Sequence, residues 1–473
     1  MKNYSKWAIL FTVFSLMSSC AEQEVDIAIA EDSVEHKEVL SDQKMGISAD
    51  CGDIDSDDAC IVAAMFGNDQ TQTRNQQKSV RNVVDIADDN GEIVMYAVNY
   101  NEGGYVLISK SKKSYPILAE VDKGEFSLDD YDETGECIVI SDMISNINML
   151  RIDSEKKKDI AWAQYERKQK KAEVRGNVNS FGSEYYDALN EIMTEYGFTG
   201  DDIRYLGSYY HADYEMSSDV YRQMVSAAES SDPWQDTEYS WDNTAIVITR
   251  YKEKRIQYGP FLQTTWNQDM VGVTSGYYPL GCVTIAVGQL MNYYRHPAYL
   301  EWDKISTYNT NQQKDFLITL RGKLKVDANG SSNINNAKDV MEDYGYSVSI
   351  EDHNISSVYS SLANSKPLYE RGTESGKTEG HAWVCDGYKY MDTYMSNILF
   401  ILDDSCYPDL KYMMVDEYID YLDVGVVRMF HMNWGWGGTH DGWYFDNFHD
   451  STNATPAPLY TTKRKNLIIK SFK

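Results

Sequence analysis

The stretch YYPLGCVTIAVGQLMNYYRHP, from Tyr277 to Pro297, places a single thiol at the start of a helical pattern. From Val283 onward, apolar residues recur at intervals of three and four, which is typical of one face of an amphipathic helix. Gly281 permits a sharp turn before this helix, and Pro297 ends it. The pattern therefore predicts a helix with Cys282 at or beside its N-terminus.

A cysteine in this position is a candidate nucleophile. The unpaired N–H groups and the positive end of the helix dipole favour a thiolate, and the thiolate is the reactive form. The alternative is structural, because free cysteine is among the most buried residue types and often acts as a small hydrophobe. A catalytic role for Cys282 requires a base elsewhere in the chain.

Among the eight histidines, His381 is the best candidate for that base. It lies in GHAWVCDGY, from Gly380 to Tyr388, where the alternation of residues predicts a half-buried strand. A histidine at the start of a strand can face a cleft, and Gly380 allows another backbone to approach closely. The alternative is a solvated histidine at a strand end. His431, within a strand-like run, is interpreted as a core histidine with satisfied hydrogen bonds.

A third motif, HMNWGWGGTHDGWYFD, runs from His431 to Asp446 and predicts two strands joined by a glycine-rich turn. Asn433 is a polar side chain beside large aromatic residues, so it is suited to orienting an imidazole or shielding it from water. Trp434 and Trp436 could do the same or simply form part of the core.

Together with TTWNQ, from Thr264 to Gln268, these motifs resemble the streptopain family of bacterial cysteine peptidases. This papain-like group is secreted as zymogens. The motifs occur in the family's order, and the similarity continues to the C-terminus. A weaker similarity covers residues 59 to about 128, which resemble the family's inhibitory propeptide.

The resemblance implies an α+β fold, with a papain-like catalytic domain preceded by an α+β inhibitory propeptide-like domain. The catalytic domain would be helical around Cys282, the nucleophile, and would carry His381, the general base, on an antiparallel sheet. Gln268 would assist the Cys282 N–H in binding the oxyanion. The residues expected to hold the base are Asn433, Trp434 and Trp436.

The same resemblance implies peptide or protein substrates with a bulky apolar side chain, and neither a metal nor an organic cofactor. Gly380 and Ser332 are the expected substrate-binding residues, Ser332 within NGSSNINN from Asn329 to Asn336. A proteinaceous inhibitor is a further possible partner. Nucleic acid is excluded as a partner because 44 Lys and Arg residues against 73 Asp and Glu residues give a net charge of −29.

The N-terminus predicts export. Lys2 and Lys6 precede the apolar run WAILFTVFSLM, which is too short to span a membrane. Two lysines followed by a short apolar run are typical of a signal peptide. The following SSC resembles a lipoprotein cleavage site, which would make Cys20 the lipidated N-terminus. The protein would then be an outer-membrane or cell-surface lipoprotein with a membrane anchor, or be secreted after maturation.

The expected organisation is a lipoprotein-type signal peptide (1–19), a flexible acidic leader (20–58), a propeptide-like inhibitory region (59–250) and a papain-like catalytic domain (251–473).

Three segments between the motifs carry further expectations. Residues 140–174 predict a long charged helix with a solvated face. The stretch at about 389–427 is an insertion between His381 and Asn433 that could reshape access to the site. Removal of the inhibitory region is expected by cleavage between residues 230 and 258, which would leave just over 200 residues.

Two other functions fit the motifs: a catalytically silent surface lipoprotein that binds peptides or proteins, and a Cys–His acyltransferase.

Overall fold

The computed structural model describes residues 46–48, 52–68, 78–129, 134–154, 159–166, 183–196, 203–209, 216–231, 241–269, 279–374, 376–378, 380–403, 411–420, 427–446 and 462–472. These residues form both helices and a large, mainly antiparallel sheet, so the expected α+β fold is confirmed. Within them, no helix is both long and apolar enough to cross a bilayer. The signal peptide and Cys20 lie outside the described residues.

The expected inhibitory region begins with four antiparallel strands. They are β1 (Val80–Ala87), β2 (Ile93–Tyr100), β3 (Tyr105–Ser109) and β4 (Ile117–Val121), with the helix α2 (Ser56–Gly67) packed against them. The leader is shorter than expected, because Ile47 is fully buried and pairs with Glu166. Ile54 is also buried, so the chain already joins the core before α2.

The helix expected at residues 140–174 differs from the prediction in position and in burial. Helix α4 runs from Glu136 to Ile152, and a separate 3-10 turn, η1, covers Ile160–Gln164. Most of α4 is buried, including Glu136 and Asp142. These two carboxylates have partners in the C-terminal half of the chain, which the local charge pattern does not reveal. The lysines of the predicted stretch lie outside the described residues, so its solvated face stays a prediction.

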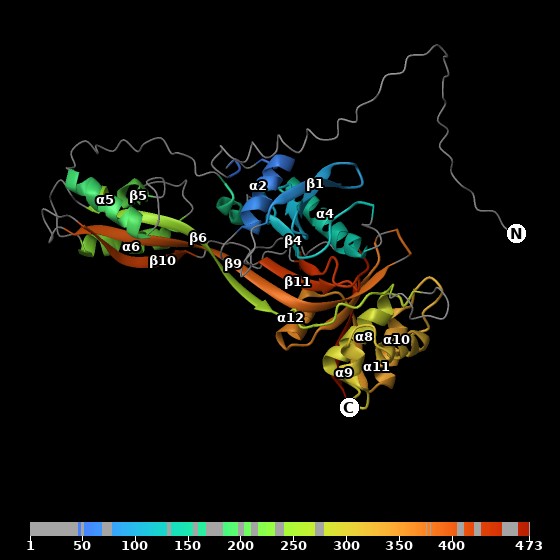
Figure 1. Cartoon of the computed structure of the whole chain (residues 1–473). Helices are drawn as coiled ribbons and strands as arrows, with labels where there is room; N and C mark the ends of the chain where they lie inside the picture. Colours follow the sequence, from blue (N-terminus) through green and yellow to red (C-terminus); the bar gives the residue numbers. More distant parts are fainter. Residues whose placement is uncertain are drawn as a thin grey trace, which may run out of the picture. The chain divides into compact units, whose positions relative to one another are not determined.

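The C-terminal half combines a group of helices with a sheet (Figure 1). The helix predicted from the opening motif is α8 (Cys282–Tyr294), and its residues 283–292 are all buried among the neighbouring helices and the sheet. The other helices are α9 (Trp302–Ser306), α10 (Asn311–Lys323), α11 (Ile334–Asp343) and α12 (Ile355–Ala363). The sheet strands are β7 (Tyr346–Asp352), β8 (Leu368–Gly372), β9 (His381–Asp403), β11 (Val427–Asn433), β12 (Gly442–Phe445) and β13 (Lys465–Phe472).

The two sheets are continuous through the pairing of β4 with β12, in the order β1-β2-β3-β4-β12-β11-β9-β8-β13-β7. The junction is reinforced by an ion pair. Lys389 Nζ lies 2.8 Å from Glu120 Oε2, and both side chains are almost fully buried. The inhibitory region is thus bound to the C-terminal half by backbone hydrogen bonds as well as side chains.

A third part of the fold is built from two segments that are distant in sequence. Strands β5 (Ile203–Tyr205), β6 (Ile246–Tyr258), the second half of β9 and β10 (Lys411–Asp420) form a four-stranded antiparallel ribbon. Helix α5 (Ser183–Tyr196) packs on one face of this ribbon, and α6 (Ser218–Ser231) packs on the other (Figure 1). We call residues 183–258 and 389–420 the accessory module.

The accessory module changes how the middle of the chain is divided. The expected domain boundary at residue 250 lies inside β6, which pairs with β9 from Ile246 to Tyr258. Its N-terminal half also supplies core residues to both faces of the ribbon, such as Val247 and Ile248. The described parts of residues 183–258 therefore pack as one unit with the second half of β9 and with β10, which belong to the expected insertion. A cut at residue 250 would sever a strand that pairs with β9 on both sides of the cut.

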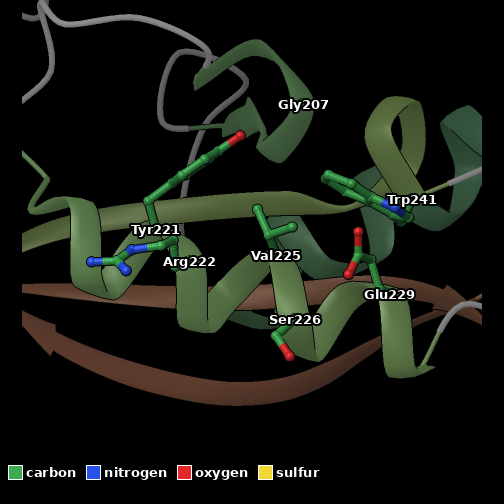
Figure 2. Close-up of a pocket in the computed structure, with 7 residues that line it drawn as sticks. All are labelled: Gly207, Tyr221, Arg222, Val225, Ser226, Glu229 and Trp241. Atoms are coloured by element: carbon green, nitrogen blue, oxygen red, sulfur yellow. The ribbon is translucent and has the colours of Figure 1, made fainter.

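The accessory module also contains a hollow of about 430 Å³, between α6, the short helix α7 (Trp241–Thr244) and the 3-10 turn η4 (Leu206–Tyr209) (Figure 2). Its lining is mostly apolar and is formed by Gly207, Tyr221, Arg222, Val225, Ser226, Glu229 and Trp241. None of these residues is among the expected catalytic residues. The hollow is therefore a feature of the module and not of the Cys282 site.

Candidate active site

Cys282 is the first residue of α8, as the opening motif predicts. The preceding Gly281 has φ +82°, and a Cβ there would lie 2.2 Å from the carbonyl oxygen of Gly330. Only glycine satisfies both the backbone conformation and the close approach. The turn brings the thiol to the end of the helix, where the first N–H groups of α8 lack partners within the helix.

His381 is the first residue of β9, and its ring is held by the backbone of the third motif. Its Nε2 lies 2.9 Å from the carbonyl oxygen of Trp434. The Cys282 thiolate is close enough to raise the pKa of this imidazole. Because Nε2 is engaged by Trp434, Nδ1 is the nitrogen left to face the thiol. The structure therefore brings together the two residues that the motifs single out.

The electrostatics of the pair favour a thiolate and an imidazolium. Burial alone would raise the pKa of the Cys282 thiol, but the charge and hydrogen bond of His381, with backbone hydrogen bonds from Ala382 and Val283, lower it below its ordinary value. Burial would lower the pKa of His381, but the Cys282 thiolate and the Trp434 carbonyl raise it. The shifts have opposite signs because each charged form stabilises the other.

Three tryptophan rings surround the base. The rings of Trp383 and Trp436 lie nearly parallel to that of His381, with interplanar angles of 10° and 7° and centroid distances of 6.5 and 6.2 Å. The Trp434 ring lies 6.1 Å away at 43°. Indole rings attract a cation over their faces, so this shell excludes water while remaining compatible with an imidazolium.

The side chain of Asn433 makes its described hydrogen bonds to residues other than His381, so its link to the base is indirect. Its Oδ1 accepts hydrogen bonds from Gln289 Nε2 at 2.8 Å and from the Gly435 N–H at 3.3 Å, and its Nδ2 donates to the Thr264 carbonyl. The Gly435 N–H belongs to the peptide group whose carbonyl accepts from His381. Asn433 thus acts on the base through the backbone.

Gln268 lies between the nucleophile and the third motif. Its N–H donates to the Gly435 carbonyl, and its own carbonyl accepts from the Leu280 N–H, two residues before Cys282. Its side chain is 8% exposed. This position is compatible with the predicted contribution to the oxyanion site, which stays a prediction.

The two residues expected to bind substrate have different surroundings. Gly380 packs on the backbone of β8, where a Cβ would lie 2.2 Å from the carbonyl oxygen of Gly372. Ser332 is half-buried, and its hydroxyl donates to the Leu324 carbonyl and accepts from Asn336. The Ser332 loop approaches Gly281, the residue before Cys282, through the backbone of Gly330. Direct substrate contacts by Gly380 and Ser332 stay predictions.

The start of α4, from the inhibitory region, lies on the active site. Gly135, the N-cap of α4, has φ +85°, and a Cβ there would lie 2.4 Å from Cδ2 of His381. The Trp436 indole donates to the Thr134 carbonyl at 3.1 Å. The inhibitory region therefore contacts both the base and one of the rings beside it.

Two buried carboxylates of α4 fix this contact. Glu136 accepts from the Tyr105 and Tyr444 hydroxyls and lies 3.0 Å from His440 Nδ1. Asp142 accepts from the N–H and hydroxyl of Thr462, the latter at 2.7 Å. In both cases a carboxylate of the inhibitory region is satisfied by groups of the C-terminal half. Without these partners, no hydrogen bonds would offset the desolvation free energy of burying the carboxylates.

Sequence reasoning missed two residues of the site. The sequence pattern places Trp383 in a strand and gives it no further role, although it stacks on His381 and donates to Glu370 Oε2 at 3.0 Å. Asp441 was included in the third motif without a role, yet its Oδ1 accepts from the Trp434 N–H at 2.9 Å. The position of Trp383, two residues after His381 and hence on the same face of the strand, is a signal that could have identified it.

A thiol at a helix start, paired with a histidine at a strand start and covered by an N-terminal segment, defines a cysteine-peptidase type of site. The comparisons agree with this class. Residues 323–444 match the Peptidase C10 family, and residues 52–136 match the Spi protease inhibitor family. The family resemblance drawn from the motifs is thereby confirmed. The first match contains His381 and the third motif as far as Tyr444, but it begins after Cys282 and so does not cover the candidate nucleophile.

Among solved structures, a mutant fragment of prointerpain A from Prevotella intermedia is similar to the chain. The identity is 13%, the match covers 82% of this chain and 98% of that chain, and the TM-score is 0.39. No curated protein matches the sequence.

The ion pair makes a prediction for thiol reactivity. Replacing His381 with alanine should slow alkylation of Cys282 by iodoacetamide near pH 6 by about tenfold or more, because each unit of thiol pKa changes the thiolate fraction tenfold in this range. The measurement is the alkylation rate between pH 5 and 9, followed by mass spectrometry of the Cys282 peptide. His296→Ala, beyond the opposite end of α8, is the control. An unchanged profile in His381→Ala would contradict the ion pair.

Proposed function

We propose that this protein is a cysteine endopeptidase made as a zymogen, hydrolysing peptide bonds with Cys282 as nucleophile and His381 as general base. The observation that carries the proposal is the contact between Gly135 and the His381 ring. A segment matching a protease inhibitor lies on the residue that a Cys–His hydrolase needs for proton transfer. The matches to a peptidase family and an inhibitor family support the same conclusion.

The reaction follows from the site geometry. The Cys282 thiolate attacks the carbonyl carbon of the substrate, and the carbonyl electrons move to the oxygen. The Cys282 N–H and the Gln268 side chain are the proposed donors to this oxyanion. His381 transfers its Nδ1 proton to the departing amine as the C–N bond breaks. A water molecule, deprotonated by His381, then hydrolyses the thioester and restores the thiolate.

The proposal extends to substrates and location. Peptides and proteins with a bulky apolar side chain are the proposed substrates, and a proteinaceous inhibitor resembling residues 52–136 is a further proposed partner. The N-terminal motif supports export and lipidation at Cys20. Because α5, α6 and β6 pack against the second half of β9 through two apolar clusters, we propose that residues 183–258 remain with the catalytic part after maturation.

Replacement of the nucleophile tests the function directly. Cys282→Ser should lower hydrolysis of a casein-derived peptide library by more than about a thousandfold, because a serine hydroxyl is not ionised by this histidine. Cys60→Ser, a thiol on α2, is the matched control and should hydrolyse peptides at the wild-type rate. Residual activity of Cys282→Ser within tenfold of wild type would contradict the assignment. If Cys282 of the wild-type protein is alkylated selectively but the protein cleaves no peptide, the acyltransferase is favoured. If Cys282 is not alkylated, the silent binding protein is favoured.

Inhibition by the N-terminal region makes a second prediction. In the unprocessed chain, Gly135→Ala should raise the alkylation rate of Cys282, because the added methyl group overlaps the His381 ring and weakens docking of α4. Overpacking of about 2 kcal/mol would increase the population with an open site roughly 30-fold.

Gly91→Ala is the matched control for this experiment. Gly91 has φ +81°, like Gly135, but a Cβ there meets nothing within 4 Å. Both alanines therefore carry a similar backbone strain, and only one disturbs the active site. Equal alkylation rates in the two variants would show that the start of α4 does not block the thiol.

A further inference from the structure

The Trp434 backbone holds the base at a point where regular sheet pairing stops. Strands β11 and β12 pair as far as Met432 and Gly442, and Asn433 is the last residue of β11. The eight residues 434–441 then form a tight loop, with positive φ angles at four positions: Gly435, Gly437, Gly438 and His440. Within this loop, the Trp434 N–H has no strand partner on β12.

The carboxyl group of Asp441 acts as the acceptor for this N–H in place of a strand carbonyl. Its Oδ1 accepts from the Trp434 N–H at 2.9 Å, which joins the first residue of the loop to the last. The two backbone carbonyls that follow this hydrogen bond accept from residues of the candidate active site. The Trp434 carbonyl accepts from His381 Nε2, and the Gly435 carbonyl accepts from the N–H of Gln268. One side chain therefore closes the loop whose backbone contacts both the base and the candidate oxyanion donor.

The hydrogen bond needs an acceptor oxygen at this position and does not need a charge. Desolvation raises the pKa of Asp441 to about 7, although the charges of His431 and His440 and the Trp434 N–H act in the opposite direction; Asp386 adds to the rise. A neutral side chain of the same shape with the same oxygen can therefore replace the carboxyl. Asparagine meets this description, whereas leucine has a similar shape and no acceptor.

We propose that Asp441 is a positioning residue for the peptidase reaction, which fixes the Trp434 peptide so that its carbonyl orients the His381 imidazole toward Cys282. This inference rests on the proposed function. It differs from a general stabilising role because the effect passes through one hydrogen bond to one backbone N–H. It therefore concerns the rate of the chemical step more than the binding of substrate.

The test compares Asp441→Asn, Asp441→Ala and Asp441→Leu, each expressed as the full chain and matured with tagged wild-type enzyme that is then removed. The alanine and leucine variants should lose about tenfold to a hundredfold in kcat, with less than a threefold change in KM, because a displaced base slows the chemical step. In the same variants, the acidic limb of Cys282 alkylation, measured on the full-length chain, should move to higher pH. The asparagine variant should keep at least about a third of the wild-type kcat and the wild-type alkylation profile.

Val348→Ala is the control for stability alone, because Val348 is a buried residue of β7 at the far edge of the sheet. It should leave both readouts unchanged. The proposal is overturned if Asp441→Leu keeps the wild-type kcat and alkylation profile, if Asp441→Asn loses as much as Asp441→Leu, or if Val348→Ala reproduces the loss. Should the wild-type chain hydrolyse no peptide at all, the proposed function fails, while the alkylation profiles of the full-length chains still decide the role of Asp441.

Discussion

The backbone pairing of β9 is the constraint on which the rest of the structure depends. This single strand starts at His381, pairs with β8 and β11 beside the active site, and continues between β6 and β10 in the accessory module. Its Lys389 also forms the buried ion pair with Glu120 of the inhibitory region. Because a shift of one residue would turn every side chain to the other face of the sheet, the register of β9 fixes the base, the module and the inhibitory contact together.

The candidate active site and its contact with the inhibitor-like region use the same group of residues. Trp436 stacks on His381 and donates to Thr134, while Tyr444 of β12 binds Glu136 of α4. Docking of α4 therefore places buried carboxylates where the C-terminal half offers hydrogen-bond donors. Buried polar groups of this kind are costly when one partner is removed, so the contact is specific as well as tight. Removal of the inhibitory region would also remove the groups that now contact the β12 edge, the His440 ring and the Tyr444 hydroxyl.

The sequence predicted what is local. The helix after Cys282, the strands beginning at His381 and around the third motif, and the strands of the inhibitory region follow from spacing, turn residues and alternation. The carbonyl that holds His381 could not be predicted, because any residue can supply a carbonyl and Asn433 offered a more obvious side chain. Burial of α4 and assembly of the accessory module also escaped prediction. Each depends on partners distant in sequence, such as Thr462 for Asp142 and Phe400 for Ile246.

The most direct test of this account follows the wild-type full-length chain over time by intact-mass spectrometry and peptide hydrolysis in the same sample. Hydrolysis should show a lag that ends as the inhibitory region is removed. The active product should retain the accessory module and so contain about 290 residues (183–473) or slightly more. A full-length chain that hydrolyses peptides at its final rate from the start and is never shortened would contradict the account.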